Sequence, residues 1–383
     1  MKICIVSSSF FPATFYGGPI SSTWGISRQI VRNGIKVYVS TTNANGKEKL
    51  DIKTNEYIKK EGVFIKYYRE EIINRFSLSF ILGIYSDIKK ADVVYIQYLF
   101  HYTVLFSLIY SVFLNKKIIL CARGSLSGFT LSNQHKLLKL VWLRLFIRPF
   151  SRKIIWQASS YLEKEDIKRR FPNAIVEVIP DGVDFSSFQN SKIISKEDMF
   201  FRYTSKRVNN LSSIFFSMGR LHEIKGFDVL IDAFSLYLNK DQAAKLIIAG
   251  GDDGFRSKLE SQIEDLRVQE SVFLIGEVSF DDKKVLLNNC DYFTLASRFE
   301  SFGIVIAEAL SCGKPIILSN KTPWHDLEEN KCGILADNNK SSFSYAFTRI
   351  VHEKYDSKEI RKYVRSNYDW KVIVGRFIKI LRS

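Results

Sequence analysis

Residues 290–320, CDYFTLASRFESFGIVIAEALSCGKPIILSN, contain an apolar strand, a loop, a helix and a second apolar strand. Tyr292 to Leu295 is apolar and β-prone, a helix is expected to start near Gly303 and end at Gly313, and KPIILSN follows as the next strand. This order of elements is typical of a parallel sheet covered by helices. The stretch therefore predicts an α/β fold around it.

Two acids flank the apolar part of this stretch. Glu300 falls on the loop, and Glu308 lies about one and a half turns inside the helix. A buried carboxylate without a partner is costly, so these acids are either solvated or meet something polar. An ionised carboxylate accepts two hydrogen bonds at once, which suits the vicinal diol of a ribose or hexose. Spacing alone leaves open that Glu300 is a solvated loop acid and Glu308 an ordinary helix-surface residue.

The same alternation extends along the whole chain. Before residue 180 the β-rich runs are KICIVSSS, IKVYVSTT, ADVVYIQYLF, KKIILCA, RKIIWQAS and IVEVIP. A polar stretch to about residue 208 follows, and the alternation then resumes with SSIFFSMGR, KLIIAGG and SVFLIGE. We therefore predict domains at 1–205 and 206–365, followed by a C-terminal helix at 366–383. Ligands of such domains bind at the carboxyl ends of the strands.

Composition excludes several other classes of protein. The 383 residues are 46% apolar and 25% charged, which is typical of globular chains rather than disordered ones. Five cysteines are scattered without C-x-x-C spacing, so neither a zinc site nor a disulfide framework is indicated. A reducing compartment fits this cysteine usage best.

Positive charge is concentrated in the first half of the chain. The net charge is +16, and residues 101–150 hold seven basic residues and no acidic one. The segment KLLKLVWLRLFIRPF at 136–150 mixes these cations with apolar residues, as in segments that lie on anionic membranes. A core helix with a basic solvent edge explains the segment equally well. We expect no nucleic acid as partner, because no recognised binding motif accompanies the charge.

Residues 93–114, VVYIQYLFHYTVLFSLIYSVFL, carry no formal charge and are long enough to span a bilayer. Their tyrosines, serines and other polar residues dilute the hydropathy. A buried strand at 93–99 and an apolar helix at 102–114 explain the segment, and we favour this interpretation over a membrane span.

The segment SMGRLHEIKGFDVL carries two cations beside a predicted helix start. A strand ends at Met218, Gly219 opens a turn with Arg220 and Lys225, and a helix starts near Gly226. Such cations add to the amides and dipole of a helix N-terminus and form an anion site, for which phosphate is the natural ligand. The alternative is two solvated loop cations.

A metal site is the weaker interpretation of the aspartates in AGGDDG. Adjacent residues on a loop point apart, so Asp252 and Asp253 are expected to be solvated. We expect no metal, because Arg220 and Lys225 would make an ion unnecessary.

Four motifs in order, FYGGPISS, IPDGVD, GRLHEIKGFDVLIDAF and ESFGIVIAE, together resemble the retaining glycosyltransferases of family 4. That family has the GT-B fold, in which two doubly wound Rossmann-like domains face each other across a cleft. The resemblance extends to YDWKVIVGRFIKIL, which in such enzymes packs back toward the first domain. RGSLSGFTLSNQHKLLK and NKTPWHDLEENKCGIL further resemble members that build bacterial surface polysaccharides.

The resemblance implies a role for each motif. Arg220 and Lys225 would neutralise the departing nucleotide diphosphate, Glu308 would hold the ribose, and Glu300 would contact the donor sugar, with Arg220, Lys225 and Glu300 forming the catalytic set. The donor-binding residues that it implies are Gly17, Gly18, Gly219, Ser301, Phe302, Gly303, Ile304 and Glu308. Retention of configuration would proceed by front-face attack of the acceptor hydroxyl, without a protein nucleophile.

This chain also departs from the family pattern. Relatives often carry histidine where the third strand of the first domain ends or in the loop after the next strand. Here those places hold Gln97 and Arg123, which become candidates for contacting the acceptor or the sugar. His101 lies nearby but is shifted along the chain.

We therefore expect a metal-independent, cytoplasmic enzyme without a cofactor, working at the inner face of the membrane. It would transfer a hexose from a nucleotide sugar to a glycan or lipid-linked acceptor, in contact with anionic lipid. A sugar-nucleotide epimerase of the same fold is the first alternative. A basic protein that binds a membrane surface or nucleic acid is the second.

Overall fold

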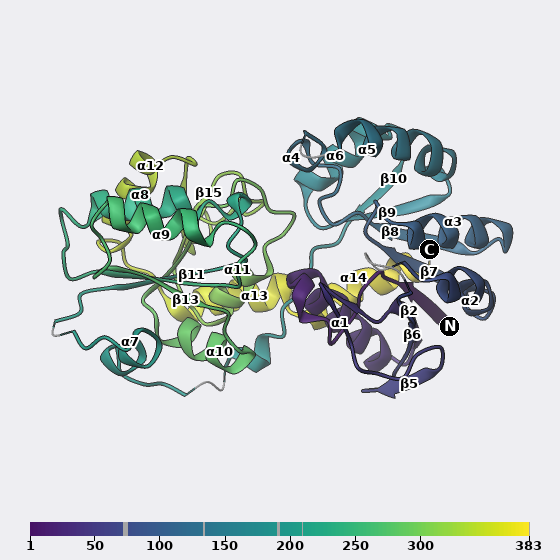
Figure 1. Cartoon of the computed structure of the whole chain (residues 1–383), viewed down its shortest axis with the longest axis horizontal. Coiled ribbons are helices and arrows are strands. Elements are labelled where there is room, and N and C mark those ends of the chain that lie inside the picture. The colour runs from purple at the N-terminus through teal and green to yellow at the C-terminus, as the bar shows by residue number, and fades with distance from the viewer. Residues whose placement is uncertain (72–75, 133–134, 190–191, 209, 383) are drawn as a thin grey trace. The chain divides into compact units, whose positions relative to one another are not determined.

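The computed structural model describes residues 1–71, 76–132, 135–189, 192–208 and 210–382. The chain forms two compact units, of which the first comprises Met1–Gly182 and Trp370–Ser383 and the second comprises Val183–Asp369. Each unit contains one large sheet with helices against it (Figure 1). The α/β class predicted from the strand and helix alternation is confirmed.

The first sheet is parallel except at one edge. β5 pairs antiparallel with β6, whereas every other neighbouring pair is parallel. In spatial order the strands are β10 (Ile175–Val178), β9 (Ile154–Ala158), β8 (Lys117–Cys121), β7 (Val93–Gln97), β1 (Lys2–Val6), β2 (Lys36–Thr42), β6 (Val63–Tyr68) and β5 (Tyr57–Lys60). A separate ribbon joins β3 (Ala44–Asn45) to β4 (Glu48–Lys49).

Side chains that alternate along β1 divide the first unit into two core layers. Ile3 and Ile5 share a layer with α1 and α14, whereas Cys4 and Val6 share the other with α2 and α3. The helices of this unit are α1 (Gly18–Arg32), α2 (Leu78–Lys89), α3 (Tyr102–Phe113), α4 (Gly128–Ser132), α5 (Lys136–Trp142), α6 (Tyr161–Arg170) and α14 (Trp370–Arg382). Shorter helical turns are η1 (Thr14–Tyr16), η2 (Leu143–Ile147) and η3 (Arg148–Phe150).

The second sheet is parallel throughout and surrounds a single large core. In spatial order its strands are β13 (Val272–Gly276), β12 (Lys245–Ala249), β11 (Ile214–Met218), β14 (Tyr292–Leu295), β15 (Ile316–Ser319) and β16 (Gly333–Ala336). The helices around it are α7 (Lys196–Thr204), α8 (Phe227–Tyr237), α9 (Arg256–Asp265), α10 (Phe280–Asn289), α11 (Ile304–Ser311), α12 (Lys340–Ile350) and α13 (Ser357–Tyr368), with short turns η4 (Phe185–Phe188) and η5 (Glu223–Lys225).

The strand order of each sheet reverses at its first strand. In the first unit β1 lies between β2 and β7, and in the second unit β11 lies between β12 and β14. Connections run to opposite sides of such a strand, so the loops that follow it and its neighbour leave a crevice at their carboxyl ends. In the second unit these are the loops after β11 and β14.

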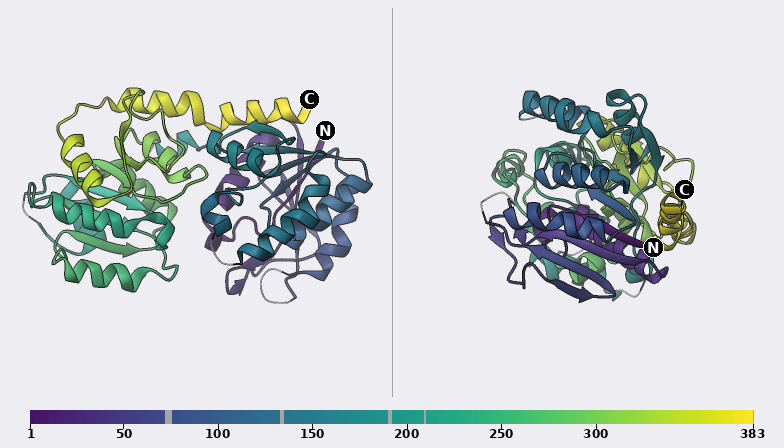
Figure 2. Two further views of the ribbon diagram at one scale, coloured as in Figure 1. Left: turned by 90° about the horizontal axis from the view of Figure 1, so that it is seen from above. Right: turned by 90° about the vertical axis from the view of Figure 1, so that its right-hand side faces the viewer.

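Helix α14 belongs to the first unit although it comes last in the chain. Trp370, Ile373 and Phe377 are buried in the layer that also contains α1, and the helix runs along this unit (Figures 1 and 2). A Cβ at Gly25 of α1 would lie 2.5 Å from the Trp370 indole, and one at Gly182 would also collide with it. Glycine at both positions therefore lets the indole pack against the backbone.

The units divide earlier in the chain than the sequence pattern predicts. The second unit starts at Val183 rather than at 206, because Phe188, Met199 and Phe200 are buried in its core. The stretch that suggested a boundary includes α7, which packs on the core of the second unit. At the other end, the first unit resumes at Trp370 rather than at 366, because α13 still packs on the second unit.

Among the described residues, no helix has both the length and the apolar character that crossing a bilayer requires. Residues 93–114 form β7 and α3, as the favoured interpretation of this segment predicts.

Replacement of Trp370 by alanine should destabilise the first unit selectively. The indole is 4% exposed, and truncation of a buried tryptophan typically costs about 3–5 kcal/mol. Thermal unfolding of the full chain should show a lower melting temperature, and hydrogen exchange should show reduced protection of α1 and α14. Tyr345→Ala, at a position 67% exposed on α12, serves as the control and should leave both unchanged. Equal losses of stability in the Trp370 and Tyr345 variants would contradict the packing of Trp370 in the core.

Candidate functional site

The loops that follow β11 and β14 meet at the carboxyl edge of the second sheet. Gly226 has φ +64°, and a Cβ there would lie only 1.9 Å from the Ala296 carbonyl oxygen, so glycine permits the two loops to touch. The Arg298 amide donates to the Ile224 carbonyl at 2.8 Å, which fixes one loop against the other. The Arg298 guanidinium also binds Asp228 through two nitrogens, at 2.9 and 2.7 Å.

Lys225 and Glu300 form an ion pair between these loops. The Lys225 Nζ lies 2.5 Å from the Glu300 Oε1, and their side chains are only 19% and 10% exposed. The Ser297 hydroxyl donates to the same carboxylate oxygen at 2.8 Å. A Cβ at Gly219 would lie 3.3 Å from the Lys225 side chain, so the glycine at the end of β11 leaves room for the lysine stem.

Arg220 has a different partner from Lys225. Its Nη1 lies 2.6 Å from the Asp253 Oδ2, and the two side chains are 53% and 34% exposed. The backbone beside Arg220 is tied to the loop after β12, because the Leu221 amide donates to the Gly251 carbonyl at 2.8 Å. The sequence predicts Arg220 and Lys225 as one anion site, and the structure places them on one turn with separate carboxylate partners.

The start of α11 presents its backbone to the same edge. Gly303 precedes the helix with φ +79°, and no side chain caps the helix that begins at Ile304. Phe302 is buried, with its ring against Trp324 and its carbonyl accepting from the Trp324 indole at 2.7 Å. Phe302 can therefore contribute only backbone to a ligand, and Ser301 lies beside it on the loop.

Glu308 is held by a lysine that the sequence analysis did not identify. The Lys283 Nζ, on α10, lies 2.6 Å from the Glu308 Oε1, and both side chains are largely buried. The Oε2 atoms of Glu308 and Glu300 make no hydrogen bond within the described residues and are not among their buried unpaired atoms. One oxygen of each carboxylate is therefore open to an incoming donor.

This edge combines fixed positive groups with open acceptors. Lys225, Arg220 and the uncapped amides of α11 suit a phosphate or diphosphate, because the helix dipole adds to the side-chain charge. The free oxygens of Glu300 and Glu308 suit hydroxyl groups, which donate hydrogen bonds. The arrangement can therefore bind an anion that is flanked by sugars.

The two adjacent aspartates have separate partners. Asp252 accepts from the amides of Gly254, Phe255 and Arg256, at 3.0, 3.1 and 3.1 Å, and these bonds, the one from Arg256 first, lower the pKa of its carboxyl. Asp253 forms a salt bridge with Arg220. Across the part of the chain that the structure describes, no three His, Cys, Asp or Glu side chains gather as a metal site would require.

The predicted glycine loop of the first unit opens α1. Gly17 precedes the helix with φ +67°, a conformation that favours glycine, and no atom lies within 4 Å of where its Cβ would be. Gly18 is the first helical residue, and Pro19 follows it. The backbone at this helix start is thus open for a close approach.

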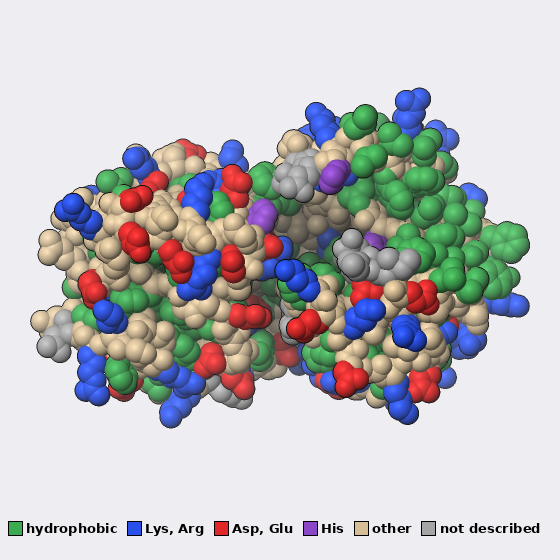
Figure 3. All heavy atoms as spheres, in the orientation of Figure 1, with side chains coloured by type: hydrophobic (Ala, Val, Ile, Leu, Met, Phe, Trp, Pro, Cys, Tyr) green, Lys and Arg blue, Asp and Glu red, His purple; other side chains and the backbone are tan. Residues whose placement is uncertain are grey.

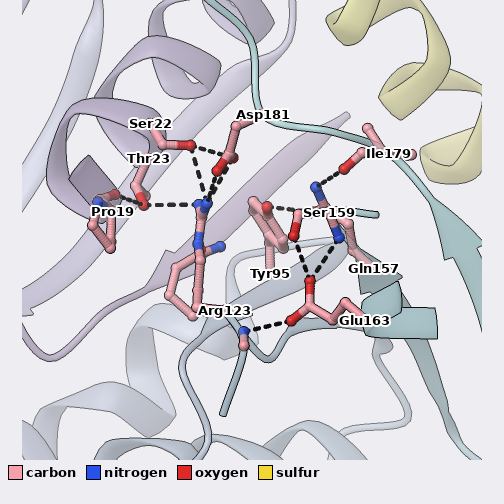
Figure 4. A network of polar contacts seen from close by, with 12 residues as sticks. Pro19, Ser22, Thr23, Tyr95, Arg123, Gln157, Ser159, Glu163, Ile179 and Asp181 are labelled. Carbon is pink, nitrogen blue, oxygen red and sulfur yellow. Dashed lines mark hydrogen bonds and ion pairs between the residues drawn. The ribbon is translucent and has the colours of Figure 1, made fainter. Parts of the chain in front are cut away.

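Arg123 and Gln97 belong to a buried polar network of the first unit, of which Figure 4 shows Arg123 with Asp181, Ser22 and Thr23. The Arg123 Nη1 lies 2.6 Å from the Asp181 Oδ1, and the Arg123 Nη2 and Nε donate to the Gln97 Oε1 at 2.9 and 3.1 Å. Ser22 and Thr23 of α1 accept from the same guanidinium, at 3.0 and 3.3 Å. Burial lowers the pKa of Arg123, but the Asp181 carboxylate, together with Cys121 and Tyr95, raises that pKa well above the usual value.

In this position the Arg123 guanidinium faces protein acceptors, and its side chain is 5% exposed. The geometry is that of a residue that positions the loops after β7 and β8 together with α1. Asp181 comes from the IPDGVD turn, so the network joins two of the motifs on which the resemblance rests.

Glu163 fixes the loop that carries Arg123 (Figure 4). Its carboxylate accepts from the Gly124 amide at 2.6 Å and from the amide and hydroxyl of Ser159 at 2.7 and 2.6 Å. Burial raises the pKa of Glu163, and these hydrogen bonds oppose the rise. The loop after β8 is thus tied to the loop after β9.

The burial of Lys225 and Glu300 predicts a larger coupling free energy than that of the exposed pair Arg220 and Asp253. Removing one partner of a buried pair leaves an uncompensated charge and costs about 3–5 kcal/mol, whereas exposed pairs typically contribute about 0.2–1 kcal/mol. Double-mutant cycles with Lys225→Met and Glu300→Gln, and with Arg220→Met and Asp253→Asn, should show this order in unfolding free energy. Equal coupling in both cycles would refute the difference in burial.

Residues 204–367 match the family model for glycosyl transferases group 1. An uncharacterized glycosyltransferase of Methanocaldococcus jannaschii is 28% identical over 227 residues, covering 57% of each chain. A GDP-mannose:cellobiosyl-diphosphopolyprenol alpha-mannosyltransferase of Xanthomonas oryzae pv. oryzae is 31% identical over 168 residues, covering 42% of this chain and 44% of the relative. The matches thus span less than two thirds of these relatives.

A solved structure has the same fold along the whole chain. HepE of Anabaena, in complex with UDP and glucose, aligns with a TM-score of 0.78 at 18% identity and covers 100% of both chains. The likeness at this identity establishes the fold, which is the GT-B fold with two Rossmann-like domains. The chain therefore has a GT-B fold, and residues 204–367 of its second unit are similar to glycosyl transferases group 1.

Proposed function

We propose that this protein is a retaining glycosyltransferase that transfers a hexose from a nucleotide-diphosphate sugar to a glycan or lipid-linked acceptor in cell-surface polysaccharide synthesis. The observation that carries the proposal is the Lys225 and Glu300 pair beside the uncapped start of α11. This arrangement lies within residues 204–367, the part that matches the glycosyltransferase family.

Two comparisons support a nucleotide sugar as the donor. The HepE structure holds UDP and glucose, and the name of the Xanthomonas relative specifies GDP-mannose as its donor. These two donors differ in base and in sugar but share the diphosphate. The diphosphate is also the part of the donor that Lys225, Arg220 and the α11 amides are suited to bind.

The chemistry of the proposed reaction requires charge stabilisation. Breaking the bond between sugar and diphosphate leaves negative charge on the departing phosphate, and fixed cations and amides lower the energy of that state. Lys225 would shift from Glu300 toward this phosphate, which frees the Glu300 carboxylate to bind sugar hydroxyls. The reaction would then need no metal. Retention would follow if the acceptor hydroxyl attacks the face of the sugar from which the diphosphate departs and passes its proton to a phosphate oxygen of that leaving group.

A mixed apolar and basic surface supports a membrane-bound acceptor. Hydrophobic side chains gather on the face of the first unit that carries α3 and α5 (Figure 3). The exposed apolar residues on these helices and on α2 and η2 include Leu82, Phe113, Leu137, Leu138 and Leu145. Within 136–150, Leu143 and Ile147 are buried in the core and Trp142 packs against it, whereas Leu137 and Leu138 are exposed. The segment therefore has both a core side and an exposed apolar side. Apolar and cationic groups together fit an anionic lipid surface.

A donor screen tests the proposed reaction. UDP, GDP, ADP and CDP sugars are added to the full chain, and the true donor should raise the melting temperature because it binds only the folded state. Lys225→Ala should abolish the shift, whereas Lys340→Ala, at an exposed position of α12, should retain it. With the donor known, NMR of the product should show the anomeric configuration of the donor.

Failure of every nucleotide sugar to shift the melting temperature would refute the proposed donor class. Conversion of the donor to an isomeric nucleotide sugar without any acceptor would instead identify an epimerase. Inversion at the anomeric carbon would leave a glycosyltransferase but refute retention.

Vesicle flotation tests the membrane contact. The full chain should bind vesicles with phosphatidylglycerol at low salt, and Leu137→Ser with Leu138→Ser should reduce binding roughly tenfold, because two largely exposed leucines would no longer insert. Leu236→Ser, at an exposed position of α8, is the control. Equal binding to neutral vesicles would refute the electrostatic part of this contact.

A further inference from the structure

The second unit contains a cavity of about 560 Å³ that the proposed donor site does not use. Its volume falls within the range of small-molecule pockets, about 300–1,000 Å³. The cavity is lined by Phe185, Lys358, Arg361, Lys362, Arg365 and Ser366. Four of these six residues are cations, all from α13, and none is an acid.

The four cations form one stripe along α13. Lys358, Arg361, Lys362 and Arg365 occupy positions i, i+3, i+4 and i+7, which lie on the same face of a helix. Side chains at these spacings are neighbours, and like charges there repel one another. An anion bound along the stripe would relieve this repulsion.

Partners within the protein neutralise little of this charge. Lys362 pairs with Glu359 at 3.2 Å, but both side chains are exposed to water. Within the described residues, Lys358 and Arg365 have no carboxylate partner, and the Arg365 guanidinium lies 5.8 Å from the centre of the Phe185 ring. The Arg361 Nη2 donates to the Cys312 carbonyl at 2.9 Å, while its Nε is buried without a hydrogen-bond partner in the described structure.

The dipole of α11 does not account for the stripe. Cys312 caps the carboxyl end of α11, where the helix carries about half a negative charge. Arg361 alone, bonded to Cys312, is sufficient to balance that charge. Within the described residues, Lys358 and Arg365 remain without a carboxylate partner, and Lys362 has only the exposed Glu359.

The cavity lies at the opposite end of α11 from the proposed donor site. Gly303 and Ile304 open this helix beside Glu300, whereas Cys312 ends it beside Arg361. A helix of eight residues is about 12 Å long, so one anion cannot occupy both places.

We propose that this cavity is a second anion site, which binds a small organic compound bearing two or more phosphate groups. Lys358 and Arg365 are seven residues apart, about 10 Å along the helix axis, so the stripe suits an elongated polyanion better than a single phosphate. The Phe185 ring supplies an apolar floor for the organic part of the ligand.

Inorganic pyrophosphate is the probe for this site, titrated calorimetrically into the full chain at low salt. The double variant Lys358→Ala with Arg365→Ala should weaken the binding of pyrophosphate in this cavity by roughly tenfold or more, because two charge-assisted contacts are lost. Lys340→Ala with Lys354→Ala removes the same charge from other exposed positions of the second unit and should change binding less than about twofold.

Thermal stability provides an independent readout. Without ligand, the Lys358 and Arg365 double variant should melt at the same or a higher temperature, because alanine favours the helix and the repulsion is relieved. Pyrophosphate should raise the melting temperature of the wild-type chain by more than that of the variant. A variant that melts lower without ligand would show that the stripe has a structural role and would overturn the proposal.

Two further results would also overturn it. Equal losses of pyrophosphate affinity in the pocket variant and the charge control would show a general charge effect. Loss of phosphatidylglycerol vesicle binding in the pocket variant, with pyrophosphate binding unchanged, would assign the stripe to a membrane instead. UDP binding should be unaffected in the pocket variant, so failure of the donor proposal remains distinguishable from failure of this one.

Discussion

The ion pair between Lys225 and Glu300 is the contact on which the candidate site depends. It joins residues 75 positions apart, from the loops after two neighbouring strands. Removing two charges from water is costly, and good geometry is needed to compensate for that cost. The 2.5 Å contact and the Ser297 hydroxyl supply such geometry at Glu300. The pair thus holds a cation and a carboxylate ready at one place before any ligand arrives.

The parallel topology places this pair at the carboxyl edge of the sheet. β11 has β12 on one side and β14 on the other, so the connections that follow β11 and β14 run toward opposite sides of the sheet. Gly226 lets these loops touch, and Asn338 donates to the Ala296 carbonyl at 2.5 Å to hold the second one. In the first unit Arg123 and Asp181 join the loops that follow β8 and β10, which lie on either side of β9. The same architecture thus produces one open site and one closed network.

The sequence predicted elements and loop positions better than partners. Apolar runs and glycines located β11, β14 and the start of α11, because these features are local in the chain. Lys283 was missed because it reaches Glu308 from α10, 25 residues away, and no local pattern marks that contact. Asp181 was visible in its turn, but its pairing with Arg123 across 58 residues required the packed strands. The structure divides the units at Val183 rather than at 206 for the same reason, because the burial of Phe188 and Phe200 arises only in the folded chain.

The two ends of α11 require different means of binding an anion. At the amino end, backbone amides point outward and the helix dipole is positive, so Lys225 and Arg220 add to charge that the backbone already supplies. At the carboxyl end the dipole is negative, and an anion there would be repelled unless side chains reverse the local charge. α13 supplies four cations at that end, of which Arg361 alone contacts the helix terminus. The excess of cations is thus what an anion site requires at the end of a helix where the backbone opposes it.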